Sequence, residues 1–337
     1  MSRRLAAVLV LLSCSLMSAQ STIPVIIDTD CGHDDLTAIA FLLARRDVRI
    51  EAVTIANGLA HVRAGAANVA RLLALGGRGD VPVFIGRETP LRRQAAFPDP
   101  WRKKSNALLS GLKVPAVGRA PEKQSAADYL AGRLRDHGHA ARVLALGPLT
   151  NFGEALEREP GMLRGVEMVI MGGAIRVPGN LGDGGTFKTS NTTAECNIFV
   201  DPLAAKRVFE SGARIQLIPL DATNHVPIHA GFLRELQRKA RSPLGEFVVA
   251  IMERDRKLIE QGTYYAWDAV AGVALVDPAA VQTSPMAIEV KQDPPEDGRT
   301  AEMIAGPANA QVALGANATA FRQIFASALV PRAASAQ

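Results

Sequence analysis

The chain has few cysteines, few aromatic residues and little net charge. Three of its 337 residues are cysteine and 5% are aromatic, so a small disulfide-stapled fold is excluded. We find no Cys/His spacing of the zinc type, no internal repeat and no low-complexity segment. The formal net charge is only +5, and no basic run is interleaved with aromatics. A nucleic-acid-binding surface is therefore not expected.

The N-terminus carries the pattern of an export signal. Arg3 and Arg4 precede an apolar run over 5–12, and small or polar residues follow through Ser21. The run is too short to span a bilayer, so we predict a cleaved signal peptide over 1–21, a domain over 22–332 and a secreted or periplasmic protein. The sequence LLSC, ending at Cys14, is an imperfect lipobox. A membrane partner is expected only if Cys14 is lipidated.

Aliphatic strand-like runs alternate with amphipathic helical stretches along most of the chain. Such alternation predicts one large α/β domain with a mostly parallel central sheet and helices on both faces. The expected strands are 25–30, 50–56, 81–85, 142–147, 166–171, 214–220, 286–291 and 311–314. The expected helices are 35–46, 65–76, 125–137, 151–158, 201–211, 229–240, 244–261, 267–276 and 317–330. Two long stretches, 87–123 and 174–194, are expected to be irregular, and loops of that length are usually functional.

The segment VIIDTDCGHDD, residues 25–35, contains four carboxylates and no Lys or Arg. Strand alternation predicts that Asp28 and Asp30 face the same side, and Gly32 permits a turn that brings Asp34 and Asp35 to a helix start. Ligands of open α/β sheets bind at this edge. Carboxylates in contact raise one another's pKa unless a cation intervenes, so the cluster indicates Ca²⁺ or Mg²⁺ rather than zinc. Without a cation, the carboxylates could instead belong to a helix N-cap or to a solvated acidic loop.

Six segments resemble, in order, those of the inosine-uridine preferring nucleoside hydrolase family. They are DTDCGHDD (28–35), ALGPLTN (145–151), VIMGGAIRVPGN (169–180), AECNIFVDPLAAKRVF (194–209), PLDATNHVP (219–227) and WDAVAGVAL (267–275). The resemblance implies the family's Rossmann-like fold, a ribonucleoside substrate, bound Ca²⁺ and a homodimer or homotetramer. An aspartyl-phosphate phosphatase also opens with DxD, but its later Lys and acidic pair are not evident here.

The resemblance also implies roles for individual residues. Asp30, Asp35 and Asp268 match calcium-ligating carboxylates, Thr150 matches a ligand through its backbone carbonyl, and Asp30 matches the general base that deprotonates the metal-activated water. Ribose contacts are implied for Asp34, Asn180, Glu195, Asn197 and Met171. These roles suit N-ribosidic cleavage, because carboxylates stabilise an oxocarbenium-like sugar and a cation can chelate its cis-diol.

Two positions depart from the family pattern. Trp267 stands where well-known members carry a His that protonates the leaving group, and an indole can stack on a base but cannot act as a general acid. Asn57 precedes Gly58, whereas many relatives have the reverse order, so its contact with ribose is a hypothesis. His33, His61 and His225 are other candidate acids, and Trp101 is a candidate stacking partner.

We therefore predict a Ca²⁺-dependent hydrolase that converts a ribonucleoside and water to ribose and free base. The alternative from another class is an exported, non-catalytic nucleoside or ribose binder, which Trp267 motivates and a retained Asp30 opposes. A third hypothesis is hydrolysis of another riboside, such as a nicotinamide riboside.

Overall fold

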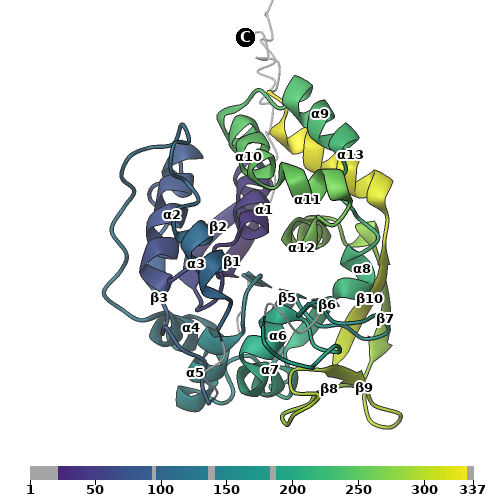
Figure 1. The fold of residues 1–337 in the computed structure, drawn as a ribbon. Coiled ribbons are helices and arrows are strands. Elements are labelled where there is room, and N and C mark those ends of the chain that lie inside the picture. The colour runs from purple at the N-terminus through teal and green to yellow at the C-terminus, as the bar shows by residue number, and fades with distance from the viewer. Residues whose placement is uncertain (1–21, 93–95, 136–140, 183–186, 332–337) are drawn as a thin grey trace, which may run out of the picture.

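The computed structural model describes residues 22–92, 96–135, 141–182 and 187–331. Within these residues, eight strands form one sheet in the order β3-β2-β1-β4-β5-β6-β10-β7, in which only β7 runs antiparallel to its neighbour (Figure 1). The strands are β1 (Ile23–Thr29), β2 (Val48–Ile55), β3 (Val83–Ile85), β4 (Arg142–Ala145), β5 (Glu167–Met171), β6 (Arg214–Ile218), β7 (Val281–Met286) and β10 (Ala310–Ala316). A separate hairpin pairs β8 (Ile288–Val290) with β9 (Thr300–Glu302).

Helices cover both faces of the sheet (Figure 1). One face is packed by α1 (His33–Leu43), α2 (Val62–Leu75), α9 (Ala230–Lys239), α10 (Pro243–Arg254), α12 (Trp267–Val276) and α13 (Ala318–Leu329). The other is packed by α4 (Ala126–Arg135), α5 (Thr150–Arg158) and α7 (Pro202–Phe209). The shorter elements are α3 (Asp99–Asn106), α6 (Cys196–Val200), α8 (Leu220–Thr223), α11 (Arg256–Gln261) and the 3₁₀ turn η1 (Pro278–Ala280).

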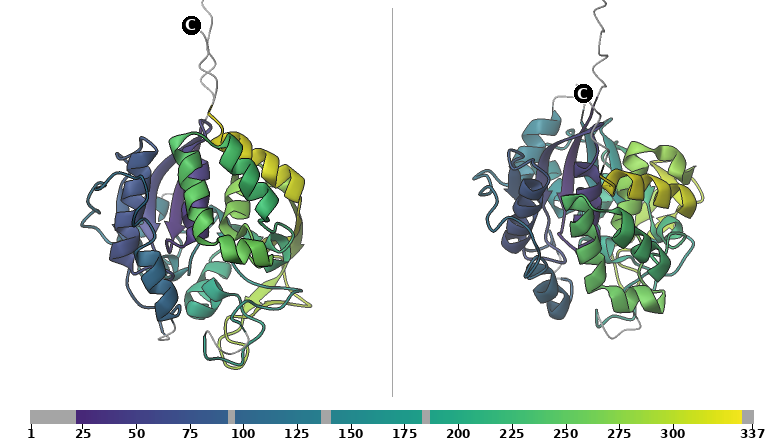
Figure 2. Two further views of the ribbon diagram at one scale, coloured as in Figure 1. Left: turned by 45° about the horizontal axis from the view of Figure 1, so that its top comes forward. Right: turned by 90° about the horizontal axis from the view of Figure 1, so that it is seen from above.

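The core explains why these segments fold as they do. Val25, Ile26 and Ile27 of β1 are completely buried, as expected for a parallel strand covered on both faces. The aromatic rings of Phe41 in α1 and Phe325 in α13 stack with centroids 5.4 Å apart. This contact ties the last helix to the first, and Figure 2 shows α13 lying beside α9 on the same face.

Strand order determines where a ligand can bind. From β1 the chain proceeds outward to β2 and β3, and it then returns to place β4 on the other side of β1. The loops after β1 and β4 therefore diverge to opposite faces, which opens a crevice at their carboxyl ends. The end of β1 and the segment after β4 meet there, because the backbone N–H of Leu146 donates to the carbonyl of Asp28 at 2.9 Å.

The α/β class and the mostly parallel sheet predicted from the sequence are confirmed. Several details differ. Helices α10 and α11 replace one helix over 244–261, β7 and β8 replace one strand over 286–291, and α3 lies in a stretch predicted to be irregular. The short elements α6, α8 and β9 were not expected. The predicted signal peptide and Cys14 lie outside the described residues. Among the described helices, none has both the length and the apolar character to cross a membrane.

Candidate active site

The loop after β1 is held in shape by Asp35. Its Oδ1 accepts hydrogen bonds from the Thr29 hydroxyl and from the backbone N–H of Asp30 at 3.1 Å, and its Oδ2 accepts from the N–H of Gly32 at 3.0 Å. Asp35, the third residue of α1, thus satisfies the backbone N–H of the N-cap residue Gly32, which is one of the two bonds of a capping box. Cys31 in this loop has φ = 63°, in the left-handed region that a non-glycine residue rarely adopts. The loop is therefore a tightly fixed turn.

Three carboxylates meet at the start of α1. Asp34, Asp35 and Asp268 each offer an oxygen, and these atoms lie within 4.8 Å of one another. Asp268 arrives from far along the chain because α12 packs against α1. Burial and the charge of Asp35 raise the pKa of Asp34 to about 8. Burial, followed by the charges of Asp34 and Asp35, raises the pKa of Asp268 well above its usual value. A cation would relieve this repulsion.

Asp30 lies beside this triad. Its Oδ2 accepts a hydrogen bond of 2.9 Å from the backbone N–H of Leu59. Burial and the neighbouring Asp35 carboxylate raise the pKa of Asp30 well above that of a free aspartate. A buried carboxylate whose pKa departs from its usual value in a pocket is a candidate for acid–base chemistry.

The expectation that Asp28 joins the other three carboxylates is wrong. Asp28 does not line the pocket; its Oδ2 accepts hydrogen bonds from Thr54 Oγ1 at 2.6 Å and Asn151 Nδ2 at 2.7 Å. Because β1 ends at Thr29, strand alternation does not extend to Asp30. Burial raises the pKa of Asp28 to about 7.

The four carboxylates Asp30, Asp34, Asp35 and Asp268 line a pocket of about 750 Å³. Its wall also contains Asn180, Glu195, Asn197, Met171 and Trp267, all of which were predicted to contact substrate. The structure therefore brings these predicted residues together, although their sequence positions are far apart.

The polar wall is built from the start of α6. Glu195 caps this helix, because its Oε1 accepts from the N–H of Asn197 at 3.0 Å and its Oε2 from that of Ile198 at 3.3 Å. Its Oε2 also accepts from the N–H of Gly173, which follows β5, at 3.0 Å. Burial nevertheless raises the pKa of Glu195. Asn197 Nδ2 donates to the Leu146 carbonyl at 2.9 Å, and Asn180 Oδ1 accepts from the N–H of Cys196 at 2.9 Å. These bonds fix the direction of each side chain.

Thr150 and Asn57 are not among the residues that line this pocket. Thr150 Oγ1 accepts from Asn57 Nδ2 at 2.8 Å and donates to Asp201 Oδ2 at 2.7 Å. Thr150 is also the first residue of α5, where a carbonyl points along the helix toward the N–H four residues on. Leu146, directly after β4, does line the pocket. Its position at the end of a predicted strand could have identified it as a pocket residue.

Aromatic side chains form the other walls. Trp267 packs with its ring centroid 5.3 Å from that of Tyr264 and 5.8 Å from that of Tyr265, and all three line the pocket. Trp101 also lines it and is 41% exposed. Of the candidate acids, His33 lines the pocket, whereas His61 and His225 do not. The sequence did not reveal Lys104 and Asp255, which also line it.

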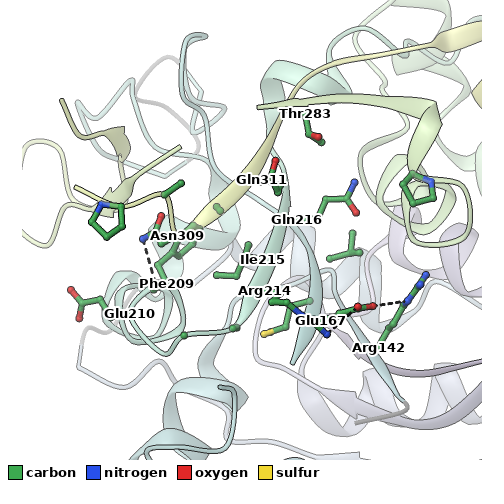
Figure 3. Close-up of a pocket in the computed structure, with 18 of the residues that line it drawn as sticks. Arg142, Glu167, Phe209, Glu210, Arg214, Ile215, Gln216, Thr283, Asn309 and Gln311 are labelled. Carbon is green, nitrogen blue, oxygen red and sulfur yellow. Dashed lines mark hydrogen bonds and ion pairs between the residues drawn. The ribbon is translucent and has the colours of Figure 1, made fainter. Parts of the chain in front are cut away.

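A second cavity, of about 930 Å³, lies at the opposite ends of the strands (Figure 3). Glu167 lies between two arginines there, 2.9 Å from Arg142 Nε and 3.1 Å from an Arg214 guanidinium nitrogen. None of the residues that line this second cavity was predicted from the sequence to act in catalysis, metal binding or substrate binding. The smaller, acidic pocket is therefore the candidate active site.

Comparison with known proteins identifies the family of this chain. The family model described as inosine-uridine preferring nucleoside hydrolase matches residues 25–323. The pyrimidine-specific ribonucleoside hydrolase RihA of Salmonella enteritidis PT4 is 32% identical over 232 residues, which cover 68% of this chain and 70% of RihA. The RihA of Citrobacter koseri is 34% identical over 232 residues, which again cover 68% of this chain and 70% of that protein.

Solved structures point to the same class. A plant nucleoside hydrolase, PpNRh1, is 28% identical with a TM-score of 0.78, and the match covers 92% of this chain and 99% of that one. A purine-preferring ribonucleoside hydrolase from Gardnerella vaginalis is 26% identical with a TM-score of 0.75, covering 91% and 98%. The chain belongs to the inosine-uridine preferring nucleoside hydrolase family. It is a hydrolase that acts on N-glycosyl compounds, with ribonucleosides as substrates.

Proposed function

We propose that this chain hydrolyses the N-ribosidic bond of ribonucleosides in the acidic pocket, with bound Ca²⁺ and with Asp30 as general base. The observation that carries the proposal is the convergence of Asp30, Asp34, Asp35 and Asp268 at one end of a pocket whose wall presents Asn180, Glu195 and Asn197. A non-catalytic binder is not favoured, because the matched relatives and structural neighbours are hydrolases.

The donor set fits a hard divalent cation. Three carboxylate oxygens lie within 4.8 Å of one another, and Lys104 is the only Lys or Arg among the described residues that line the pocket. Lys104 is already paired with Asp255 at 2.8 Å, so it does not neutralise the triad. Oxygen ligands of this kind suit Ca²⁺ or Mg²⁺.

The cation would be held by Asp35 and Asp268 of the triad and by Asp30 beside it, and the third member of the triad, Asp34, lies next to them. Among backbone carbonyls we propose that of Leu146 in place of Thr150, because Leu146 lines the pocket and Thr150 does not. A bound divalent cation would lower the pKa of an attacking water and would bind the two vicinal hydroxyls of the ribose.

The protein residues would then divide the remaining work. Asp30, which lines the pocket beside the triad, accepts the proton of the attacking water. Asp34, Asn180 and Asn197 orient the ribose hydroxyls, and Glu195 places negative charge beside the developing oxocarbenium ion. Met171 packs under the sugar, and Trp267 offers its ring face to the base. A ribose 2′-hydroxyl is required, so deoxyribonucleosides are poor substrates.

The test is release of reducing sugar from uridine, cytidine, inosine, adenosine and 2′-deoxyuridine, each with Ca²⁺ and with a chelator. The panel covers both base classes, because the relatives include pyrimidine-specific and purine-preferring enzymes. We expect turnover of ribonucleosides that the chelator removes and Ca²⁺ restores. Binding without turnover would reject the proposal in favour of a binder.

The sequence also led us to propose export and self-assembly. Secretion or periplasmic location follows from the proposed signal peptide, and N-terminal sequencing of the mature protein checks the cut after Ser21. Light scattering coupled to size exclusion checks for a homodimer or homotetramer.

A further inference from the structure

Helix α3 forms one pocket wall, where Trp101 contacts the rings of Phe97 and Phe187 and the other attachments are polar. Helix α3 contributes Trp101, Lys104 and Ser105 to the pocket lining, and Ser105 is its buried residue. At its C-terminal end, Asn106 Oδ1 accepts from the backbone N–H of His61 at 2.9 Å, and the Ser105 carbonyl accepts from Asn68 Nδ2 at 3.1 Å. A segment with little buried apolar surface opens at low free-energy cost. The position of α3 therefore depends on a few individual contacts.

Lys104 extends from α3 to Asp255, a residue 151 positions further along the chain. Its Nζ lies 2.8 Å from Asp255 Oδ1. Asp255 ends α10 and begins α11, and its side chain is only 4% exposed. The contact joins α3 to the wall that carries Leu258 and Tyr264.

The second oxygen of the same carboxylate is also engaged. Asp255 Oδ2 is paired with Nδ1 of His33, the first residue of α1 and the neighbour of the acidic triad. Burial alone would raise the pKa of Asp255, but its contacts with His33 and Lys104 outweigh burial and lower that pKa. The carboxylate is thus a charged bridge between two segments of the pocket.

We propose that Asp255 is a positioning residue for nucleoside binding: it fastens α3 over the pocket through Lys104 and fixes that wall relative to the metal loop through His33. The inference rests on the proposed function, since it assigns Asp255 to the same pocket. Asp255 and Lys104 act by placing the wall against which the substrate packs.

The main test replaces Lys104, which is half exposed, so the variant is expected to fold. Lys104→Met removes the charge and keeps most of the side-chain length, Lys104→Arg retains the charge, and exposed Lys103→Met is the matched control on the same helix. We expect Lys104→Met to raise KM for a ribonucleoside about three- to tenfold with kcat within about twofold, a range suited to one partly exposed ion pair. Lys104→Arg and Lys103→Met should keep KM within about twofold of the wild type.

Hydrogen exchange supplies a readout that needs no turnover. In the metal-loaded protein, amides over 99–106 should exchange about three- to tenfold faster in Lys104→Met and in Asp255→Asn than in Lys103→Met. In the Asp255→Asn background, Lys104→Met should add nothing, because both changes remove the same contact.

Unchanged α3 exchange in Lys104→Met, or equal KM values for Lys104→Met and Lys103→Met, would overturn the inference. Wild-type protein that cleaves no ribonucleoside would instead reject the proposed function, and hydrogen exchange would then decide the inference alone.

Discussion

Gly58→Ala tests the position of Asp30 without changing its chemistry. A Cβ added to Gly58 would lie 1.9 Å from Asp30 Oδ2 and 2.4 Å from Asp30 Cβ. Ordinary contact between carbon atoms requires about 3.5–4 Å, so the Asp30 side chain or the segment around Gly58 must move by roughly 1 Å or more. A misplacement of about 1 Å costs on the order of 100-fold in rate, which corresponds to about 2.7 kcal/mol of activation free energy.

The assay is kcat/KM for uridine and inosine at saturating Ca²⁺, together with the melting temperature. Gly132→Ala in α4 is the control, because a Cβ there meets nothing within 4 Å and alanine suits a helix interior. We expect Gly58→Ala to lose about 100-fold in kcat/KM and Gly132→Ala to match the wild type. The Leu59 N–H bond to Asp30 would also be disturbed, which costs about 1–2 kcal/mol of stability. A folded Gly58→Ala protein with activity within about threefold of the wild type would refute a requirement for Asp30 in this position.

Three further predictions concern protons. In the presence of chelator, the free energy of unfolding should fall between about pH 6 and 8: the pKa of Asp34 is raised to about 8 by burial and Asp35, so the folded state keeps a proton that the unfolded state has already released. Thermal melting across this range checks the sign, and a rise would contradict it. Asp28→Asn should raise the melting temperature of the chelated protein at pH 8, because it removes a buried charge. The pKa of about 7 instead of 3.8 means that this charge destabilises the folded state by at most about 4 kcal/mol. An equal or lower melting temperature would show that the buried charge does not destabilise the protein. p-Nitrophenyl riboside, whose leaving group needs no proton, should be cleaved faster than inosine because Trp267 cannot protonate the base; equal rates would reveal another acid in the pocket.

Regular elements with a strong apolar pattern could be predicted from the sequence. All six expected strands between 25 and 220 and most helices are present, because burial on both faces of the sheet imposes continuous aliphatic runs. Helix α3 could not be predicted in this way. Its sequence DPWRKKSN contains one large apolar residue, and tertiary contacts such as Lys104–Asp255 hold it in place.

The site was predictable where its residues sit in contiguous motifs. Asp34, Asp35, Asn180, Glu195 and Asp268 all line the pocket as expected. The predicted position of Asp28 beside Asp30 was wrong because β1 ends at Thr29, so that Asp30 no longer follows the alternation of the strand. Sequence patterns locate the ends of strands poorly. The bridge from His33 to Asp255 joins residues 222 positions apart, so no local pattern could reveal it.

The arrival of Asp268 from α12 has a consequence for biosynthesis. A ribosome-bound chain that has emerged only as far as α11 carries Asp34 and Asp35 but lacks Asp268, the third member of the acidic triad. Strand β10, which lies between β6 and β7 in the sheet, is added later still. The acidic triad is therefore complete only once the last quarter of the polypeptide has been made.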